Sequence, residues 1–394
     1  MDKKSVKDLD LQGKKVLMRA DFNVPLDSDK NITDDSRIKA ALKTINYILE
    51  KKGKLILISH LGRPKGQPKE EFSLRPVAKR LSQLIGKPVK MVDDCIGQKV
   101  KDEVDGLEPG GVILLENLRF HPQEKANDQS FAKDLASLAD LYVNDAFGTA
   151  HRAHASTEGV THFLDSAAGF LIDKEINYFQ KVLTDPKPPF VFILGGAKVS
   201  DKIPVIENML DKANSIVIGG AMAYTFLKAK GQEVGSSLLE ADMLELVQKT
   251  LIKAKEKGVD ILLPLDHIVT DDIKAGKNLK TTEGVDIESG WIGVDIGPKT
   301  QKEFGEKIKT AGTIVWNGPM GIFENDLFSQ GTKSIAEAIT ESQAVSVIGG
   351  GDTAAAVKKF QLEEKMSHIS TGGGASLQYL EGKELPGISA LSDK

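Results

Sequence analysis

The stretch FVFILGGAKVSDK (Phe190–Lys202) decides the fold class. Its five apolar residues, Phe190–Leu194, predict a strand buried on both faces, as in a parallel sheet. Gly195–Gly196 follow at once, and Ser200–Lys202 are predicted to open a helix, so that Lys198 and Lys202, four apart, would share one side of a helical turn. In wound α/β sheets ligands bind beyond the carboxyl ends of the strands, so this stretch also marks a candidate site.

The same strand-then-helix pattern recurs along the whole chain and predicts an α/β protein of two doubly wound, Rossmann-like halves with parallel sheets. Strands are predicted at Lys14–Arg19, Lys54–Ser59, Val112–Leu115 and Leu141–Val143, and then at Phe190–Leu194, Ser215–Ile218, Asp260–Leu263, Thr313–Val315 and Ala344–Ile348. Helices are predicted at Asp35–Glu50, Ser73–Ile85 (with Ser73 as N-cap), Met243–Glu256 and Ser329–Thr340, and another begins at Ala354.

The best domain boundary follows residue 170. Leu171–Leu183 is predicted to be a helix, and Thr184–Pro189 then carries three prolines, which make a stiff connector. We expect residues 1–170 to form one domain, 171–184 a connecting helix and 185–375 a second domain. The polar stretch Asp271–Gly290 is expected to be mostly loop.

Composition narrows the classes of function. The 394 residues are 40% hydrophobic, which is enough for two packed cores, and the net charge of −4 gives no general attraction for nucleic acid or an anionic membrane. The one cysteine, Cys95, excludes an intramolecular disulfide and fits a reducing cytoplasm; we expect it to fill a small apolar site. Met1–Lys15 shows no apolar segment of a secretory signal, and no apolar run is long enough for a membrane helix.

Arginine and glycine are distributed in opposite ways. All seven arginines precede residue 153, whereas 25 of the 37 glycines follow residue 170. Polar residues gather at the predicted strand ends and at one helix start of the first half: Asp21, Asn23, Arg37, His60, Arg63, Asn117, Arg119, Asn144, Asp145, His151, Arg152 and His154. Guanidinium groups bind phosphate and carboxylate bidentately, so this half is predicted to bind a small ligand with at least two negative groups. Arg19 lacks this placement, and Arg75 and Arg80 are assigned to a solvated helix face.

In the second half the strand ends carry glycine. They run into Gly195–Gly196, Gly219–Gly220, Asn317–Pro319, Gly349–Thr353 and Gly372–Gly374. Glycine lets backbone N–H groups approach phosphate oxygens, and Asp352 is a hard oxygen ligand suited to Mg²⁺ beside phosphates. Taken singly, each signal has a plainer explanation: a surface ion pair for an arginine, a structural hydrogen bond for a histidine, a tight turn for a glycine pair.

Two other classes of function stay open at this point. Gly349–Ala354 fits the loose dinucleotide pattern G-x-G-x-x-A of a nicotinamide dehydrogenase, but the acidic residue required about 20 positions later is missing, since Glu364 comes too early. A non-catalytic nucleotide-binding scaffold would not need the arginine set. A P-loop motif is absent from the sequence.

Eight segments closely resemble the phosphoglycerate kinase family, over essentially the whole chain. They are RADFNVP (Arg19–Pro25), SHLGRP (Ser59–Pro64), LENLRF (Leu115–Phe120), YVNDAFGTAHRAHAS (Tyr142–Ser156), GGAKVSDKI (Gly195–Ile203), WNGPMGIF (Trp316–Phe323), IGGGDTAAA (Ile348–Ala356) and STGGGAS (Ser370–Ser376).

The resemblance implies two domains facing each other across a hinge cleft, with the C-terminal tail from about residue 376 to 394 returning to the first. It implies a reversible transfer of a phosphoryl group between 1,3-bisphosphoglycerate and ADP, giving 3-phosphoglycerate and ATP, with Mg²⁺ as cofactor. The partners would be these small molecules, with no nucleic acid and no membrane, and the enzyme would be a cytoplasmic monomer. Transfer would be direct and in line after domain closure.

The resemblance also implies roles for individual residues. Asp21, Asn23, Arg37, His60, Arg63, Arg119 and Arg152 would hold the phosphoglycerate. Lys202, Gly219, Gly220, Gly293, Asn317, Glu324, Gly350, Gly351, Asp352 and Thr353 would bind the nucleotide, with Asp352 on the metal. Arg37, Lys198, Lys202, Gly350 and Gly373 would act on the transferring group.

Overall fold

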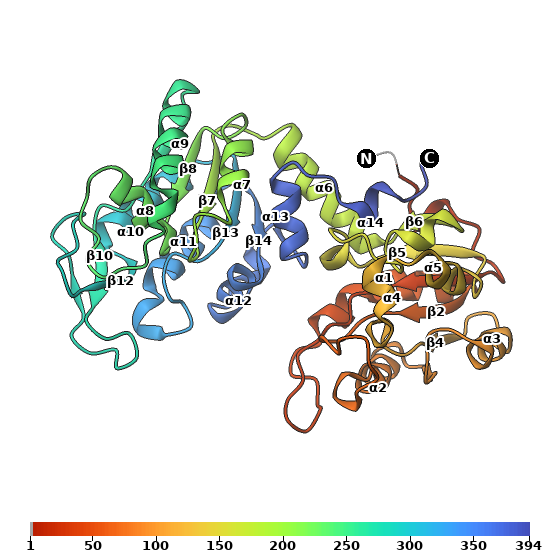
Figure 1. Ribbon diagram of the computed structural model, residues 1–394. Coiled ribbons are helices and arrows are strands. Elements are labelled where there is room, and N and C mark those ends of the chain that lie inside the picture. Colours follow the sequence, from red (N-terminus) through yellow and green to blue (C-terminus); the bar gives the residue numbers. More distant parts are fainter. Residues whose placement is uncertain (1–2) are drawn as a thin grey trace. The chain divides into compact units, whose positions relative to one another are not determined.

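The computed structural model describes residues 3–394, which form two compact units (Figure 1). Unit 1 comprises the chain up to Asn177 together with Glu384–Lys394, and unit 2 comprises Tyr178–Lys383. Helix α6 (Phe170–Thr184) crosses the boundary between them. The sequence of unit 2 is therefore inserted into that of unit 1.

Unit 1 is built on a six-stranded parallel sheet in the order β3-β4-β2-β1-β5-β6. Its strands are β1 (Lys15–Arg19), β2 (Lys54–Ile58), β3 (Lys90–Met91), β4 (Val112–Leu114), β5 (Leu141–Asn144) and β6 (Asp165–Ala168). Its other helices are α1 (Ser36–Glu50), α2 (Arg75–Ile85), α3 (Gln98–Asp105), α4 (Pro122–Ala126), α5 (Gln129–Ala136) and α14 (Pro386–Ser389). The chain reverses its winding direction between β1 and β5, which places the switch point there.

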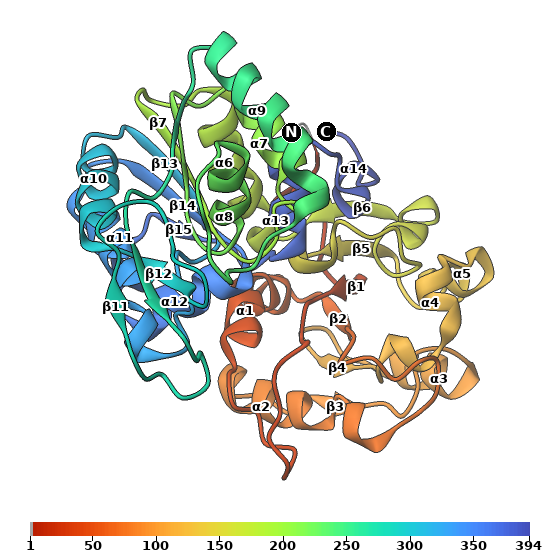
Figure 2. The ribbon, with the colours of Figure 1, turned by 60° about the vertical axis from the view of Figure 1, so that its left-hand side comes forward.

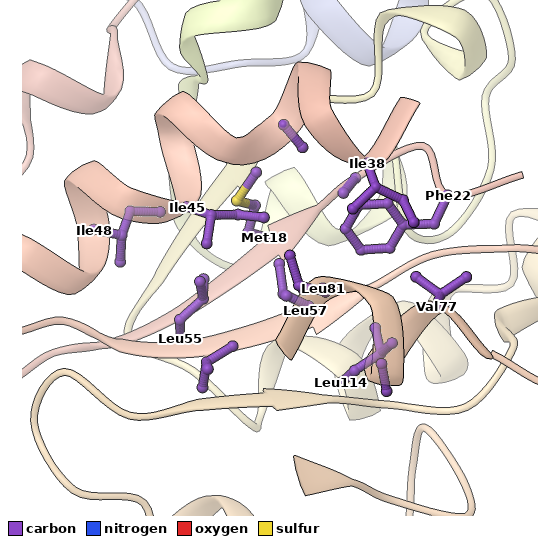
Figure 3. Close-up of a cluster of buried hydrophobic side chains, with 14 of the residues drawn as sticks. Met18, Phe22, Ile38, Ile45, Ile48, Leu55, Leu57, Val77, Leu81 and Leu114 are labelled. Carbon is purple, nitrogen blue, oxygen red and sulfur yellow. The ribbon is translucent and has the colours of Figure 1, made fainter. Parts of the chain in front are cut away.

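The core of unit 1 forms where α1 and α2 cover one face of this sheet (Figure 3). Apolar residues recur along α1 at helical spacing, and Ile38, Ile45 and Ile48 are fully buried. Figure 3 shows them between the α1 ribbon and the sheet, beside Met18 of β1 and toward the leucines of β2. Burying each such side chain contributes about 1.5–3 kcal/mol.

Unit 2 has a second six-stranded parallel sheet in the order β15-β14-β13-β7-β8-β9, with β14, β13 and β7 visible together in Figure 2. Its strands are β7 (Phe190–Leu194), β8 (Ser215–Ile218), β9 (Asp260–Leu262), β13 (Thr313–Asn317), β14 (Val345–Gly349) and β15 (His368–Ile369). Its helices are α7 (Ile203–Met209), α8 (Met222–Ala229), α9 (Leu244–Glu256), α10 (Pro298–Lys309), α11 (Gln330–Glu341), α12 (Gly351–Lys359) and α13 (Gly374–Leu380). The switch point lies between β7 and β13, and the predicted fold class is confirmed in both units.

Unit 2 also contains a small antiparallel sheet that the sequence did not indicate. It joins β10 (His267–Thr270), β11 (Lys280–Thr281) and β12 (Ile292–Ile296) in the order β11-β10-β12. Part of the expected loop Asp271–Gly290 is therefore a strand.

Three helix starts differ from the prediction by more than one residue. Helix α2 begins at Arg75 with Leu74 as its N-cap, because Pro76 favours the first turn. The Ser73 hydroxyl accepts from the Arg75 N–H at 3.3 Å and donates to Glu116 Oε2 at 2.7 Å. Helix α12 begins at Gly351 rather than Ala354. Helix α7 begins only at Ile203, so the predicted helical turn joining Lys198 to Lys202 is wrong.

Described residues near both ends of the chain contact each other in unit 1. The Lys4 N–H donates to the Ser392 carbonyl at 2.9 Å, and Lys3 pairs with Asp393 at 2.7 Å. Within residues 3–394 the structure has no helix long and apolar enough to cross a membrane.

Candidate active site

The strand ends beside the unit 1 switch point carry a linked set of polar groups. Asp21 follows β1, and its Oδ2 accepts a hydrogen bond from Arg37 Nη1 at 2.7 Å, at the first turn of α1. Asn23 Oδ1 accepts from the Gly62 N–H at 2.8 Å, which ties the end of β1 to the loop after β2. Neither contact uses all the hydrogen-bonding capacity of the side chains, and Asp21, Asn23 and Arg37 stay partly exposed.

Arg19 is a member of this site that the sequence did not reveal. It is only 1% exposed, its Nε donates to Ser156 Oγ at 3.0 Å, and its Nη2 lies 3.0 Å from His60 Nδ1. Because a guanidinium only donates, His60 Nδ1 must accept, and the ring proton therefore belongs on Nε2. Arg19 thus orients the ring of His60.

The His60 ring lies among four guanidinium groups. Burial and the charges of Arg19, Arg119, Arg152 and Arg37 hold the pKa of His60 well below its ordinary value. The ring is therefore neutral at neutral pH and offers an Nε2–H donor.

A cavity of about 700 Å³ opens beside this group. It is lined by basic residues, two prolines and one glycine: Arg63, Pro64, Lys65, Gly66, Arg119, His121, Pro122, Lys125, Arg152 and His154. Burial, with Arg19 and Arg152 nearby, lowers the pKa of Arg119 to about 10, so it stays charged at neutral pH. Arg119 Nη1 donates to the Gly62 carbonyl at 2.9 Å, while its buried Nε has no hydrogen-bond partner among residues 3–394. Such a cavity favours an anion.

Buried Glu124 organises the rim of the cavity. Burial alone would raise its pKa, but His154, Arg19 and Ser156 lower it, so that it stays charged. It accepts hydrogen bonds from the Ser156 N–H and hydroxyl, and its Oε1 lies 3.7 Å from His154 Nδ1. Glu124 therefore neutralises part of the positive charge without facing the cavity.

In unit 2 two glycine loops meet at the switch point between β7 and β13. A side chain at Gly195 would place its Cβ 2.0 Å from the Pro319 carbonyl oxygen and 2.6 Å from that of Gly318. Only glycine allows this approach. Because the two loops pack closely, it is their backbone that lies at the edge of the sheet, at the carboxyl ends of the strands.

Lys202 is a partly buried cation at this edge. Its Nζ hydrogen-bonds Asn317 Oδ1 at the end of β13. Burial lowers its pKa, and the nearby carboxylates of Asp201, Asp352 and Glu381 act in the opposite direction. The structure thus brings Lys202, Asn317 and Asp352 together, whereas Lys198 is exposed and lies outside α7.

The start of α12 adds polar groups at the same edge. Gly350 is its N-cap with φ of +91°, and Asp352 is exposed in the first turn. Thr353 Oγ1 is buried and accepts from the Gly318 N–H at 2.6 Å. Gly351 is exposed at the first position of α12, and Gly373 is the N-cap of α13.

The remaining predicted nucleotide-binding residues are three glycines and one glutamate elsewhere in unit 2. Gly219 and Gly220 follow β8, and a Cβ on Gly219 would lie against Met320. Gly293 belongs to β12, and a Cβ there would lie 2.0 Å from the Tyr224 hydroxyl. Glu324 is exposed in the loop before α11.

The topology speaks against a nicotinamide dehydrogenase. In dinucleotide-binding folds the glycine fingerprint follows the first strand of the unit, which here is β7. Gly349–Ala354 instead follows β14. The resemblance of this stretch to the fingerprint is therefore accidental.

Three comparisons with known proteins all find similarity to the same family. A family model described as "Phosphoglycerate kinase" matches residues 6–383. A phosphoglycerate kinase of Pseudothermotoga lettingae is 56% identical over the whole of both chains, and one of Chlorobaculum tepidum is 55% identical over the same extent. Among solved structures, phosphoglycerate kinase from Coxiella burnetii superposes with a TM-score of 0.89 at 43% identity, over 98% of each chain.

Proposed function

The chain belongs to the phosphoglycerate kinase family, and from that premise we propose how its residues divide the work. The enzyme reversibly transfers a phosphoryl group between 1,3-bisphosphoglycerate and ADP, giving 3-phosphoglycerate and ATP, as an ATP:3-phospho-D-glycerate 1-phosphotransferase of glycolysis. Our proposal is that unit 1 binds the phosphoglycerate and unit 2 the nucleotide.

The group around His60 supports the first half of this proposal. Phosphoglycerate carries a phosphate and a carboxylate, which Arg63, Arg119 and Arg152 can bind from the walls of the cavity. His60 adds a neutral Nε2–H donor, which stays a donor over a wide pH range because its pKa is depressed. Asp21 holds Arg37 in place, and Asn23 fixes the loop that carries Arg63.

The glycine loops of unit 2 support the second half. Backbone N–H groups of Gly350, Gly351 and Gly373 at helix starts can bind phosphate oxygens, with Lys202, Asn317 and Thr353 beside them. We assign Lys198 to the transferring group, Glu324 to the ribose, and Gly219, Gly220 and Gly293 to the base.

Mg²⁺ fits the donor set at the start of α12. Asp352 is an exposed carboxylate near Lys202, and one carboxylate beside nucleotide phosphates matches the ordinary binding mode of this ion. Asp352 would hold the ion, and the bound ion would supply charge neutralisation for the phosphate oxygens.

No covalent step on the protein is required. A carboxylate oxygen of the glycerate and the terminal phosphate oxygen of the nucleotide exchange the phosphoryl group directly, in line. Arg37, Lys198, Lys202 and the N–H groups of Gly350 and Gly373 would stabilise the charge on the transferring group. Since the two ligands bind to different units, we propose that the units close about α6 during turnover and exclude water.

We further propose that the enzyme works as a monomer in the cytoplasm. Every side chain assigned above comes from one chain, so a second copy is not needed to complete either site. The buried, unpaired Cys95 suits a reducing compartment.

Calorimetric titration with each ligand tests the division of labour. We expect Arg63→Gln to weaken 3-phosphoglycerate binding at least tenfold and to leave MgATP binding unchanged. Arg75→Gln is the matched control, because Arg75 is an exposed helix residue paired with Asp93. Equal losses in the two variants, or a loss of MgATP binding in Arg63→Gln, would contradict the assignment.

An activity assay tests the reaction independently of the assignment of residues to each ligand. The wild-type protein should phosphorylate 3-phosphoglycerate with ATP and Mg²⁺ when a reductive, NADH-consuming step removes the product. If the wild-type protein turns over but Arg63→Gln binds 3-phosphoglycerate as tightly as the wild type, the reaction stands and only the residue assignment is overturned.

A further inference from the structure

Asp94, Cys95 and His121 form a cluster in unit 1 that the reaction does not use. Asp94 and Cys95 follow β3, and His121 precedes α4. Asp94 Oδ1 lies 2.7 Å from His121 Nε2 and accepts the Cys95 N–H at 2.7 Å. One ligand atom from each of the three residues lies within 4.8 Å of the others.

The surroundings of the Cys95 thiol are negative. Besides burial, the charges that act most on it are the carboxylates of Asp94, Glu124 and Glu116, and together these influences raise the pKa of the thiol far above its usual range. This setting differs from the cavity next to it, which is lined by arginine and lysine and is bordered by the same His121. A negative pocket of this kind stabilises a cation.

The cluster is open on one side and closed on the other. The Asp94 side chain is 53% exposed and that of His121 24%, whereas Cys95 is fully buried. A cation could therefore enter past the carboxylate and the imidazole and meet the sulfur last.

We propose that Asp94, Cys95 and His121 form a binding site for a thiophilic divalent metal ion of the zinc type. Thiolate, imidazole and carboxylate are the three ligand classes that Zn²⁺ takes in proteins, and three protein ligands leave a fourth position for water. On binding, the metal–sulfur bond replaces the S–H bond and the thiol proton passes to solvent. With one thiolate, one carboxylate and a neutral imidazole, the complex with a divalent ion carries no net charge.

The movements required are small. Tetrahedral bonds of about 2.0–2.3 Å separate neighbouring ligand atoms by roughly 3.4–3.6 Å. The pair Asp94–His121 must open from 2.7 Å, and the sulfur must approach from at most 4.8 Å. A sulfur ligand also disfavours Mg²⁺, so the site would not compete for the ion of the reaction.

Cobalt titration of the full-length enzyme tests the proposal directly. Cys95 is the only cysteine, so a thiolate-to-cobalt charge-transfer band can arise nowhere else in the chain. We expect one Co²⁺ per chain to give that band together with intense visible bands of tetrahedral cobalt. Zn²⁺ should displace the cobalt and abolish both, while excess Mg²⁺ should not.

Variants then identify the ligands. Cys95→Ser should abolish the charge-transfer band, and His121→Asn and Asp94→Asn should each weaken cobalt binding at least tenfold. Asp93→Asn and His162→Asn are matched controls, because both residues are exposed and paired elsewhere, and they should bind like the wild type.

A thermal melt of each variant shows that it is folded. A folded wild-type enzyme without the charge-transfer band at saturating Co²⁺ would overturn the proposal. A band that persists in Cys95→Ser would also overturn it, as would equal weakening in Asp93→Asn and Asp94→Asn.

Discussion

The two units use the same strand-end edge of a parallel sheet in different ways. In unit 1 the edge carries guanidinium groups around the neutral His60, and the side chains define the site. In unit 2 the edge carries glycines, and the close approach of Gly195 to Pro319 places backbone where side chains would otherwise stand.

This difference predicts different consequences of mutation. A guanidinium can be removed from unit 1 without filling or emptying the core, because most of the set lies at a cavity wall. A methyl group added to Gly195 of unit 2 would instead meet the backbone of the neighbouring loop, which cannot move aside. Charge removal should therefore affect function in unit 1, and added volume should affect stability in unit 2.

The largest effect is expected from Arg37→Ala. Loss of its charge from the transferring group should lower kcat about 100- to 1,000-fold, with the melting temperature nearly unchanged since the side chain is 40% exposed. Steady-state kinetics and a thermal melt measure both quantities. Arg80→Ala, which removes an arginine paired with Asp35 on the neighbouring helix, is the control and should keep its turnover. A near-normal kcat in Arg37→Ala would remove this residue from the reaction.

Gly195→Ala tests whether added volume lowers the stability of unit 2. The new Cβ would overlap the Pro319 carbonyl, so we expect unit 2 to lose about 3 kcal/mol of unfolding free energy. Both tryptophans, Trp291 and Trp316, belong to unit 2, so tryptophan fluorescence during urea unfolding reports this unit alone. Gly284→Ala, where no atom lies within 4 Å of the new Cβ, should unfold like the wild type. Coincident unfolding curves for the two variants would show that the close approach does not matter.

The units are alike in one respect, a buried carboxyl that holds a helix start. Asp145 Oδ1 accepts from the Leu171 N–H at 2.8 Å near the start of α6, and Asp295 Oδ2 accepts from the Gly331 N–H at 2.6 Å near the start of α11. Burial raises the pKa of each to about 7.

The pH dependence of stability follows from these two pKa values. Between about pH 4 and 7 the folded chain binds protons that the unfolded chain has released, so each group's stabilisation is complete at the acidic end and is lost as the pH rises to 7. Asp295→Asn should remove a slope of up to about 1.4 kcal/mol per pH unit, measured by urea unfolding of unit 2 at a series of pH values. Asp145→Asn should do the same for unit 1, followed by circular dichroism. An unchanged slope in either variant would mean that its carboxyl is charged throughout.

The smallest effect is expected from Asp352→Asn. Neutralising one ligand while phosphates and waters remain should weaken the Mg²⁺ dependence of turnover about tenfold. A Mg²⁺ titration at fixed ATP measures it, with the exposed Glu364→Gln as control. Superimposable titrations of Asp352→Asn and wild type would exclude Asp352 as a ligand.

Strand positions were predictable where the apolar pattern is local. Phe190–Leu194 and Ser215–Ile218 have the predicted bounds, since buried parallel strands are continuous apolar runs. The start of α7 was missed although Pro204 marks it, and a proline at the first turn is a signal that could have been used. Strands β10 and β11 are short and partly polar, and only pairing with each other and β12 makes them strands.

Arg19 shows why part of the site could not be predicted. It ends a strand in the same way as an ordinary surface residue, and although it opens the segment Arg19–Pro25 that resembles the family, its position in the strand does not mark it as a site residue. Its role depends on Ser156 and His60, which are far away in the chain and reach it only through the fold. The cluster of Asp94, Cys95 and His121 was missed for the same reason, because His121 joins the other two across a separate loop.

The insertion of unit 2 within unit 1 has a consequence for synthesis. On the ribosome, unit 2 is complete once Lys383 has emerged, whereas unit 1 still lacks Glu384–Lys394, which includes α14 and the partners of Lys3 and Lys4. The unit that begins first therefore finishes last, the reverse of the usual N-to-C order of domain folding. Because the two ends of unit 1 already touch, a short peptide could join them, and new ends opened in a surface loop would let unit 1 emerge whole.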